Sequence, residues 1–212
     1  IDYHDVPDRF LLNGCMVASG LLVKWFAEVF APDLGSGEDR YARLDAEAAP
    51  TPPGADGLVV LPYFLGEKTP IFDADARGMI SGLTLAHRRG HLFRAVLEAV
   101  AYGFRHHVDV LVEGGHPIRS IRIMDRGARS PLWRQIVADV LGRSIEYAPG
   151  ADLGSAFGVA WVAGVALGAW GWSRPPEPAG AVHHAIPERT ARYDVLYRRY
   201  RELGGVSTGG HT

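Results

Sequence analysis

The fold of this chain is decided by Ile121-Arg122-Ile123-Met124-Asp125-Arg126-Gly127-Ala128-Arg129-Ser130-Pro131-Leu132-Trp133. An apolar strand is predicted at its start, followed by a turn of small residues and then a helix. The Ser130 hydroxyl can cap free helical amides, and Pro131 suits the first helical position. The apolar residues that follow recur at helical spacing: Trp133, Ile136, Val137, Val140 and Leu141. The start of a helix is therefore well signalled.

The turn in this segment has the features of an anion-binding site. The first amides and the dipole of a helix favour an anion, and Gly127 and Ala128 have almost no side chain to hold a ligand away from the backbone. Nucleotides dock at turns of this kind. A plain strand-to-helix connection, which any α/β domain contains, explains the segment equally well, so the rest of the chain must decide.

Composition limits the classes of protein to consider. With 212 residues, 47% of them hydrophobic, the chain can bury one sizeable core, and we expect one domain. A formal charge of -2 gives no electrostatic reason to expect nucleic acid or an anionic membrane as partner. The single Cys15 cannot form an internal disulfide, which favours a cytoplasmic location. The chain begins with Ile1 and not Met, and we expect a piece of a longer protein.

Strand-like and helix-like segments alternate along the chain, which predicts a wound α/β sheet with helices packed on it. The apolar, charge-free run at 156–170 is too short for a membrane span, and we expect a buried helix there. Residues 173–187 predict a surface crossing rich in proline and glycine, and 204–212 a mobile tail. The predicted helices cover 17–30, 41–48, 88–113, 131–141, 154–170 and 193–203, and the predicted strands end at 12 or cover 58–61, 79–85, 121–123 and 144–148.

Several motifs resemble one known family. They are Leu61-Pro62-Tyr63-Phe64-Leu65-Gly66-Glu67-Lys68-Thr69-Pro70, Asp73-Ala74-Asp75-Ala76-Arg77-Gly78, Gly82-Leu83-Thr84-Leu85-Ala86-His87, Arg94 to Tyr102, the Gly127 turn and Gly154 to Ala160. In this order and spacing they resemble the C-terminal domain of the FGGY carbohydrate kinases over nearly the whole chain. The resemblance implies an actin-like, ribonuclease H-like α/β fold with a mixed sheet flanked by helices. It also implies that residues 1–212 form the C-terminal lobe of a two-lobed kinase.

The family clasps ATP between two lobes, and its phosphate-binding turn and catalytic carboxylate belong to the N-terminal lobe. This chain shows no counterpart of either, so we predict no catalytic residue and expect the piece alone to be inactive. The resemblance implies ATP and Mg²⁺ as cofactors, with Mg²⁺ held mainly by the phosphates and the other lobe. The motif at 62–68 is more similar to the ketose and pentulose kinases than to the glycerol kinases. In the family most sugar contacts come from the other lobe.

Nucleotide contacts carried over by the resemblance fall on Gly20, Lys24, Gly127, Ala128 and Pro131. The Lys24 ammonium either reaches a phosphate or is solvated, which is the commoner fate of a helical lysine. Pro131 stands where glycerol kinases present an asparagine to the base, and the missing amide removes that contact.

The sharpest departure from the family is Arg126, where the family usually has the first glycine of a Gly-Gly pair. A long cation there either blocks the nucleotide or pairs with a phosphate. We predict weakened ATP affinity, because the side chain must find room and the backbone angle can be one that only glycine adopts easily. Met124 also replaces a usual small polar residue. These departures support an alternative function, a degenerate kinase-like binding or regulatory module.

The loop with Gly66, Glu67 and Lys68 is predicted to line the cleft between the lobes. A structural role is at least as consistent, with Glu67 accepting backbone amides. We expect local hydrogen bonds among Asp73, Asp75 and Arg77 to lock this loop.

His87 and His91 are spaced like zinc ligands, and His106-His107 and His183-His184 are pairs. No third ligand stands at a recognised spacing, so we predict no metal site in this chain. The expected partners are a small sugar, ATP, the protein's own N-terminal lobe and, as an open alternative, a second copy of the chain, because an isolated lobe exposes apolar surface.

Overall fold

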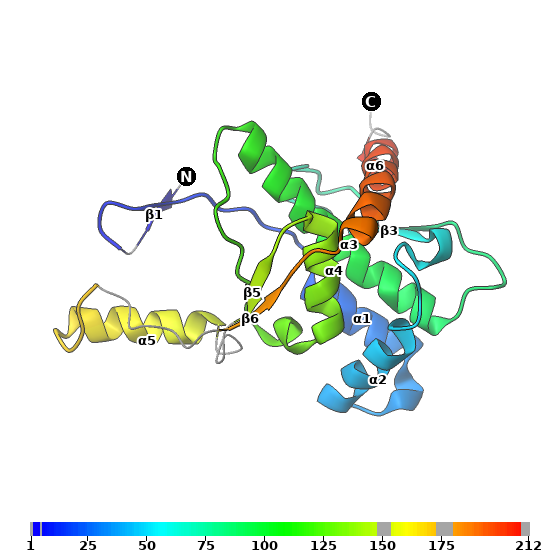
Figure 1. The fold of residues 1–212 in the computed structure, drawn as a ribbon, viewed down its shortest axis with the longest axis horizontal. Helices are drawn as coiled ribbons and strands as arrows, with labels where there is room; N and C mark the ends of the chain where they lie inside the picture. Colours follow the sequence, from blue (N-terminus) through cyan, green and yellow to red (C-terminus); the bar gives the residue numbers. More distant parts are fainter. Residues whose placement is uncertain (1, 5, 148–153, 173–179, 209–212) are drawn as a thin grey trace.

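The structure is a computed structural model, and it describes residues 2–4, 6–147, 154–172 and 180–208. Helices dominate it (Figure 1). They are α1 (Gly20–Phe30), α2 (Glu38–Ala48), α3 (Arg89–Glu113), α4 (Pro131–Leu141), α5 (Gly154–Ala166) and α6 (Pro187–Thr208), with short 3-10 turns η1 (Pro32–Leu34), η2 (Ala55–Gly57) and η3 (Arg126–Arg129).

The strands form short antiparallel pairs. They are β1 (Asp2–Tyr3) with β2 (Phe10–Leu11), β3 (Val59–Leu61) with β4 (Met79–Ser81), and β5 (Ile145–Tyr147) with β6 (Ala181–His183). The strand predicted at 121–123 is reduced to a parallel bridge between Arg122 and Glu146. The backbone hydrogen bonds of this bridge run from Ile123 N to Glu146 O (3.0 Å) and from Glu146 N to Ile121 O (2.9 Å). The ladder around β5 is thus mixed, with a parallel neighbour on one side and antiparallel β6 on the other.

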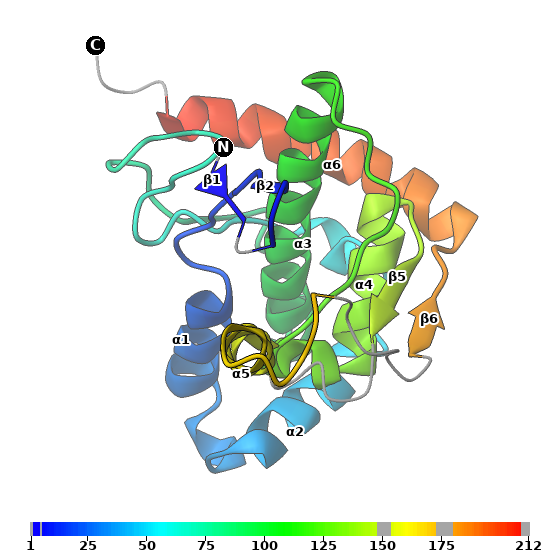
Figure 2. The ribbon, with the colours of Figure 1, turned by 90° about the vertical axis from the view of Figure 1, so that its left-hand side faces the viewer.

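The long helix α3 lies at the centre of the molecule (Figure 2). Helices α1, α2 and α4 pack against it, and its apolar side is buried from Phe93 to Tyr102. Phe26 of α1 contacts Phe93 at a ring separation of 5.4 Å. The apolar stripe that the sequence predicts on this helix is therefore its core face, as expected.

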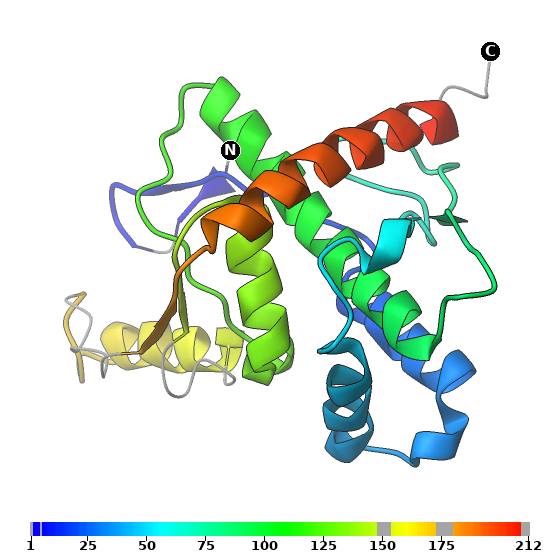
Figure 3. The same cartoon turned by 45° about the vertical axis from the view of Figure 1, so that its right-hand side comes forward.

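Helix α6 runs across α3 and α4 (Figure 3). Its buried tyrosines pack on Tyr102 of α3, with ring separations of 6.1 Å to Tyr193 and 5.2 Å to Tyr200. The helix begins at Pro187, earlier than the predicted Tyr193, and continues through Thr208. Residues 204–208 of the predicted tail are therefore helical. The rest of that tail, 209–212, and residues 173–179 of the predicted crossing lie outside the described residues.

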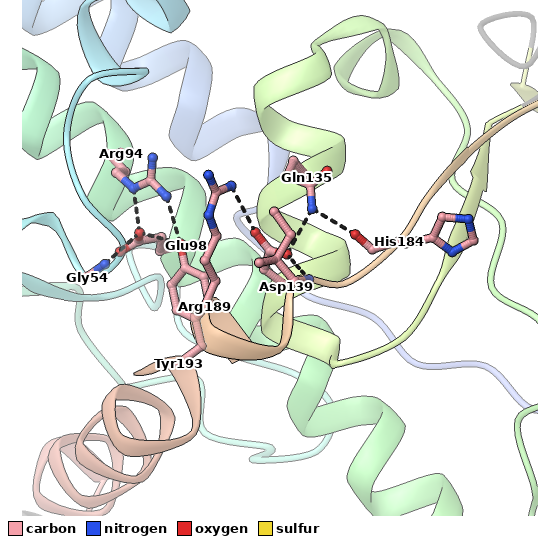
Figure 4. Close-up of polar contacts among 9 residues, drawn as sticks. Gly54, Arg94, Glu98, Gln135, Asp139, His184, Arg189 and Tyr193 are labelled. Atoms are coloured by element: carbon pink, nitrogen blue, oxygen red, sulfur yellow. Dashed lines mark hydrogen bonds and ion pairs between the residues drawn. The ribbon is translucent and has the colours of Figure 1, made fainter. Parts of the chain in front are cut away.

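Two buried carboxylates tie helices together (Figure 4). Glu98 Oε1 accepts hydrogen bonds from Gly54 N (2.9 Å), Arg94 Nε (2.8 Å) and the Tyr193 hydroxyl (2.8 Å). Glu98 is 1% exposed and Arg94 4% exposed, so the pair lies in the core. Desolvation raises the pKa of Glu98, and the Arg94 charge opposes that effect.

The second carboxylate is Asp139 of α4, which is also buried. Its Oδ1 accepts from Ile186 N and from Gln135 Nε2, both at 2.8 Å, and Arg189 lies 3.4 Å from Oδ2. This carboxylate therefore fixes the start of α6 against α4.

The prediction of a buried helix at 156–170 is wrong. Helix α5 extends away from the other helices in Figure 1, and Val159 is 69% and Leu167 85% exposed. The segment that follows α5 covers part of the helix, because Trp172 contacts Trp161 at a ring separation of 5.6 Å. Apolar residues on every side of a helix predict burial, but burial also needs a partner surface, and no other described helix packs extensively against α5. Among the described residues no helix combines the length and apolar character needed to cross a membrane.

Candidate functional site

The Gly127 turn has the geometry of a capped helix start. Ser130 Oγ accepts from Trp133 N at 3.0 Å, and Pro131 is the first residue of α4. The predicted cap and helix start are both confirmed. The residue with an unusual backbone angle is Asp125, with φ +70° and ψ 178°, and not Arg126. The expectation that Arg126 needs a glycine-like angle is therefore wrong, because η3 begins at Arg126 and the strained bend precedes it.

The outer face of the turn is open to solvent. Arg126 and Gly127 are exposed, whereas Ala128 is 1% exposed and packs inward. A Cβ placed on Gly127 would lie 3.8 Å from Trp133 Nε1, an ordinary van der Waals contact. The Arg126 side chain therefore stands at the edge of the turn and is not packed into it.

Helix α2 anchors the turn, which the sequence reasoning missed. Arg129 forms an ion pair with Glu38 at 2.6 Å. The Ser130 side chain also bonds to Asp45, whose pKa is raised by burial, with the Ser130 hydrogen bond acting against that rise. One serine thus caps α4 and joins it to α2. The partners are far apart in sequence and follow no spacing rule, so no sequence signal marks them.

Gly20 and Lys24 lie on α1, which also packs on α2. Apart from its chain neighbours and the backbone of α1 itself, no atom of the described residues comes within 4 Å of a Cβ built on Gly20. Lys24 lies 3.8 Å from Glu28 on the same helix, and both side chains are more than half exposed. The elements of the two predicted clusters, α1 and η3, therefore both contact α2. The structure shows Lys24 with a carboxylate partner of its own.

The loop predicted to line the cleft is tied to the segment before α1. Glu67, which is 5% exposed, accepts hydrogen bonds through Oε1 from Val17 N (2.9 Å) and Lys68 N (2.8 Å). This is the backbone-accepting role that the sequence suggested for it. Gly66 has φ +73°, and a Cβ there would lie 2.5 Å from Ala74 O, so glycine is required. Lys68 is exposed.

The expected local lock of this loop is present. Asp73 Oδ1 accepts from Asp75 N (2.8 Å) and Ala76 N (3.0 Å), and Arg77 lies 3.8 Å from Asp75. The three polar residues therefore have a structural role in holding the turn that follows the loop.

A further anchor of the loop comes from α3. His107 Nδ1 bonds to Gly103 O at 2.8 Å, so Nε2 accepts from the Thr69 hydroxyl at 2.9 Å. The same Thr69 oxygen accepts from Cys15 N at 2.6 Å. The sequence marked His107 only as half of a histidine pair.

The histidines weighed as zinc ligands have other roles. His87 Nδ1 accepts from Thr84 N at 2.9 Å, and His91 Nδ1 accepts from Arg88 N at 3.1 Å to complete the cap of α3. His91 Nε2 lies 3.2 Å from Asp56. In the part of the chain that the structure describes, no group of at least three His, Cys, Asp or Glu side chains is placed to hold a metal ion.

Residues 2–167 match the FGGY family of carbohydrate kinases, C-terminal domain. This chain belongs to that family. It is 34% identical over 163 residues to xylulose kinase of Escherichia coli, covering 77% of this chain and 32% of the relative. It is 32% identical over 202 residues to glycerol kinase of Halorhodospira halophila, covering 92% and 37%.

Solved structures agree with the family assignment. Xylulose kinase from Rhodospirillum rubrum is 44% identical with a TM-score of 0.77, over 91% of this chain and 39% of that one. The match confirms the α/β, actin-like fold expected from the sequence. The chain spans between 32% and 39% of the length of these relatives.

Proposed function

We propose that this FGGY domain holds the nucleotide in an ATP-dependent carbohydrate kinase. Joined to an N-terminal lobe, it would close over a sugar, preferably a ketose or pentulose, while the γ-phosphate of ATP passes to a sugar hydroxyl. The observation that carries the proposal is the open Gly127 turn at the capped start of α4. Two of the relatives named above are xylulose kinases, which supports the sugar class.

The chain's own residues supply positioning. Ser130 fixes the first turn of α4, and Arg129 and Asp45 hold that turn against α2. The amides and dipole at the start of α4 favour the negative charge of a nucleotide. Phosphoryl transfer depends mainly on such positioning and on charge neutralisation, so a rigid turn is useful to it.

Metal binding is proposed to depend on the other lobe. The described residues offer no ligand set for a metal ion, so the proposed Mg²⁺ would be held by the ATP phosphates and the N-terminal lobe. Catalytic residues are likewise proposed for that lobe. We further propose a cytoplasmic location, supported by the free Cys15.

Titration of ATP into the full-length kinase that contains this domain, with and without a panel of ketoses, tests the proposal. We expect saturable ATP binding and a ketose-dependent release of ADP. Absence of ATP affinity together with retained binding of a protein partner would favour the rival function, a kinase-like binding or regulatory module. This alternative function is supported by three departures from the family pattern, at Arg126, Met124 and Pro131.

The variant Arg126→Gly sharpens the test. Since the strained backbone angle lies at Asp125, the proposed obstacle to the nucleotide is the bulk of the Arg126 side chain. We expect the variant to bind ATP more tightly by calorimetry. Arg119→Gly, an exposed arginine in the loop after α3, is the matched control and should leave the affinity unchanged. Equal or weaker ATP binding by Arg126→Gly would contradict the proposed blocking role.

A further inference from the structure

A second hollow lies away from the Gly127 turn, between the end of β3, α3 and α6. Its volume is about 160 Å³. The lining residues are Tyr63, Ile71, His106, Arg201, Gly204 and Gly205. A cavity of roughly 150 Å³ is large enough to admit a six-carbon ring, so this one has room for a small organic or inorganic ligand.

His106 lines the hollow without a hydrogen-bond partner among the described residues. Its side chain is only 9% exposed. Burial lowers the pKa of His106 to about 4, and the positive charge of Arg201 adds to the effect. Asp109 on the same helix acts in the opposite direction, and neighbouring His107 acts with Arg201. The imidazole is therefore neutral at pH 7 and keeps one N–H donor for a ligand.

Arg201 brings a positive charge to the same hollow. Its Nη1 donates to the Tyr197 hydroxyl at 3.2 Å, and no carboxylate of the described residues forms an ion pair with it. The guanidinium therefore retains N–H donors that can bind a ligand. Tyr63, which also lines the hollow, donates its hydroxyl to Tyr200 at 3.2 Å, and this hydrogen bond restrains the Tyr63 side chain.

We propose that this cavity binds a small oxyanion, held by the charge of Arg201 and by the N–H of His106. Carboxylate and phosphate share the required chemistry, which is a compact negative charge with several acceptor oxygens. The site does not depend on the proposed kinase activity. Tyr63 and Ile71 flank the loop that contains Gly66, Glu67 and Lys68, so a ligand here contacts both ends of that loop.

NMR of the His106 ring, in titrations with sodium phosphate and separately with sodium acetate at constant ionic strength, tests the proposal. We expect saturable shifts of the His106 signals and a rise in its pKa in the presence of the anion, since a nearby negative charge favours the protonated ring. The arm with the lower Kd identifies the preferred oxyanion. Absence of a saturable shift with both anions would overturn the proposal.

Arg201→Gln is expected to weaken binding of the preferred anion by about tenfold or more, because a charge-assisted contact is lost. Arg198→Gln makes the same change on an exposed face of α6 and should not alter the Kd. An equal effect of both substitutions would reveal general charge attraction and refute a built site. Circular dichroism of both variants checks that α6 remains folded.

Discussion

The Arg94–Glu98 pair offers the sharpest test of how this fold is held together (Figure 4). Arg94→Met removes the charge that faces Glu98 but keeps an unbranched apolar chain in the core. Glu98 Oε1 would retain only Gly54 N and the Tyr193 hydroxyl, and its Oε2 has no partner among the described residues even in the native chain. Removing one partner of a buried pair costs about 3–5 kcal/mol, so we expect a loss of that size at neutral pH.

The pH dependence of this loss follows from the direction of the pKa shift. Without Arg94 the already raised pKa of Glu98 rises further, so the folded state binds a proton that the unfolded state has released. Stability of the variant should then fall as pH rises above the unfolded pKa of about 4.3 and be regained toward acid pH. The double variant Arg94→Met/Glu98→Met should recover most of the loss, because no charge remains buried.

Urea unfolding of the protein, followed by circular dichroism between pH 5 and pH 8, measures these differences. Arg198→Met, on the exposed side of α6, is the matched control, and we expect it to change stability by less than about 0.5 kcal/mol. The reasoning is refuted if Arg94→Met lies within about 1 kcal/mol of the parent, a cost typical of a surface ion pair. A double variant less stable than the single variant would refute it as well.

Three more predictions concern the nucleotide site, the buried histidine and the exposed helix. Gly20→Ala should change stability by less than about 0.5 kcal/mol, because Gly20 is the first residue of α1 and a Cβ there meets no described neighbour within 4 Å outside its own helix. It should nevertheless weaken ATP binding by about tenfold in the full-length kinase. Gly158→Ala, at an equally open position, is the control, and unchanged ATP affinity in Gly20→Ala would argue against a close backbone approach. Because the pKa of His106 is lowered in the folded state, the unfolded state gains a proton first as pH falls below about 6.5, and the free energy of unfolding should drop by about 2 kcal/mol by pH 5. Urea titrations should show that this contribution vanishes in His106→Gln. It should persist in the control His116→Gln, which changes an exposed histidine. The exposed apolar surface of α5 predicts concentration-dependent association of the isolated domain by light scattering, reduced in Val159→Glu; a strict monomer at all concentrations would contradict it.

Local patterns in the sequence are sufficient to predict most helices. Ser130 and Pro131 mark the start of α4, and the stripe on α3 marks its core face, because capping and helical periodicity act over a few residues. The family motifs likewise locate the candidate nucleotide turn. Expectations fail where a single residue is considered without its neighbours. The strained angle expected at Arg126 is adopted by Asp125 instead.

The sequence by itself determined the family and the order of helices, and it predicted which residues contact a nucleotide. Tertiary structure alone decided which groups meet: Asp45 with Ser130, Thr69 with His107, and His106 with Arg201 around a cavity. It also decided that α5 stays exposed although its composition predicts burial. The physical reason is the range of the interactions. Caps and periodicity depend on chain neighbours, whereas burial and pairing depend on surfaces that distant segments bring together.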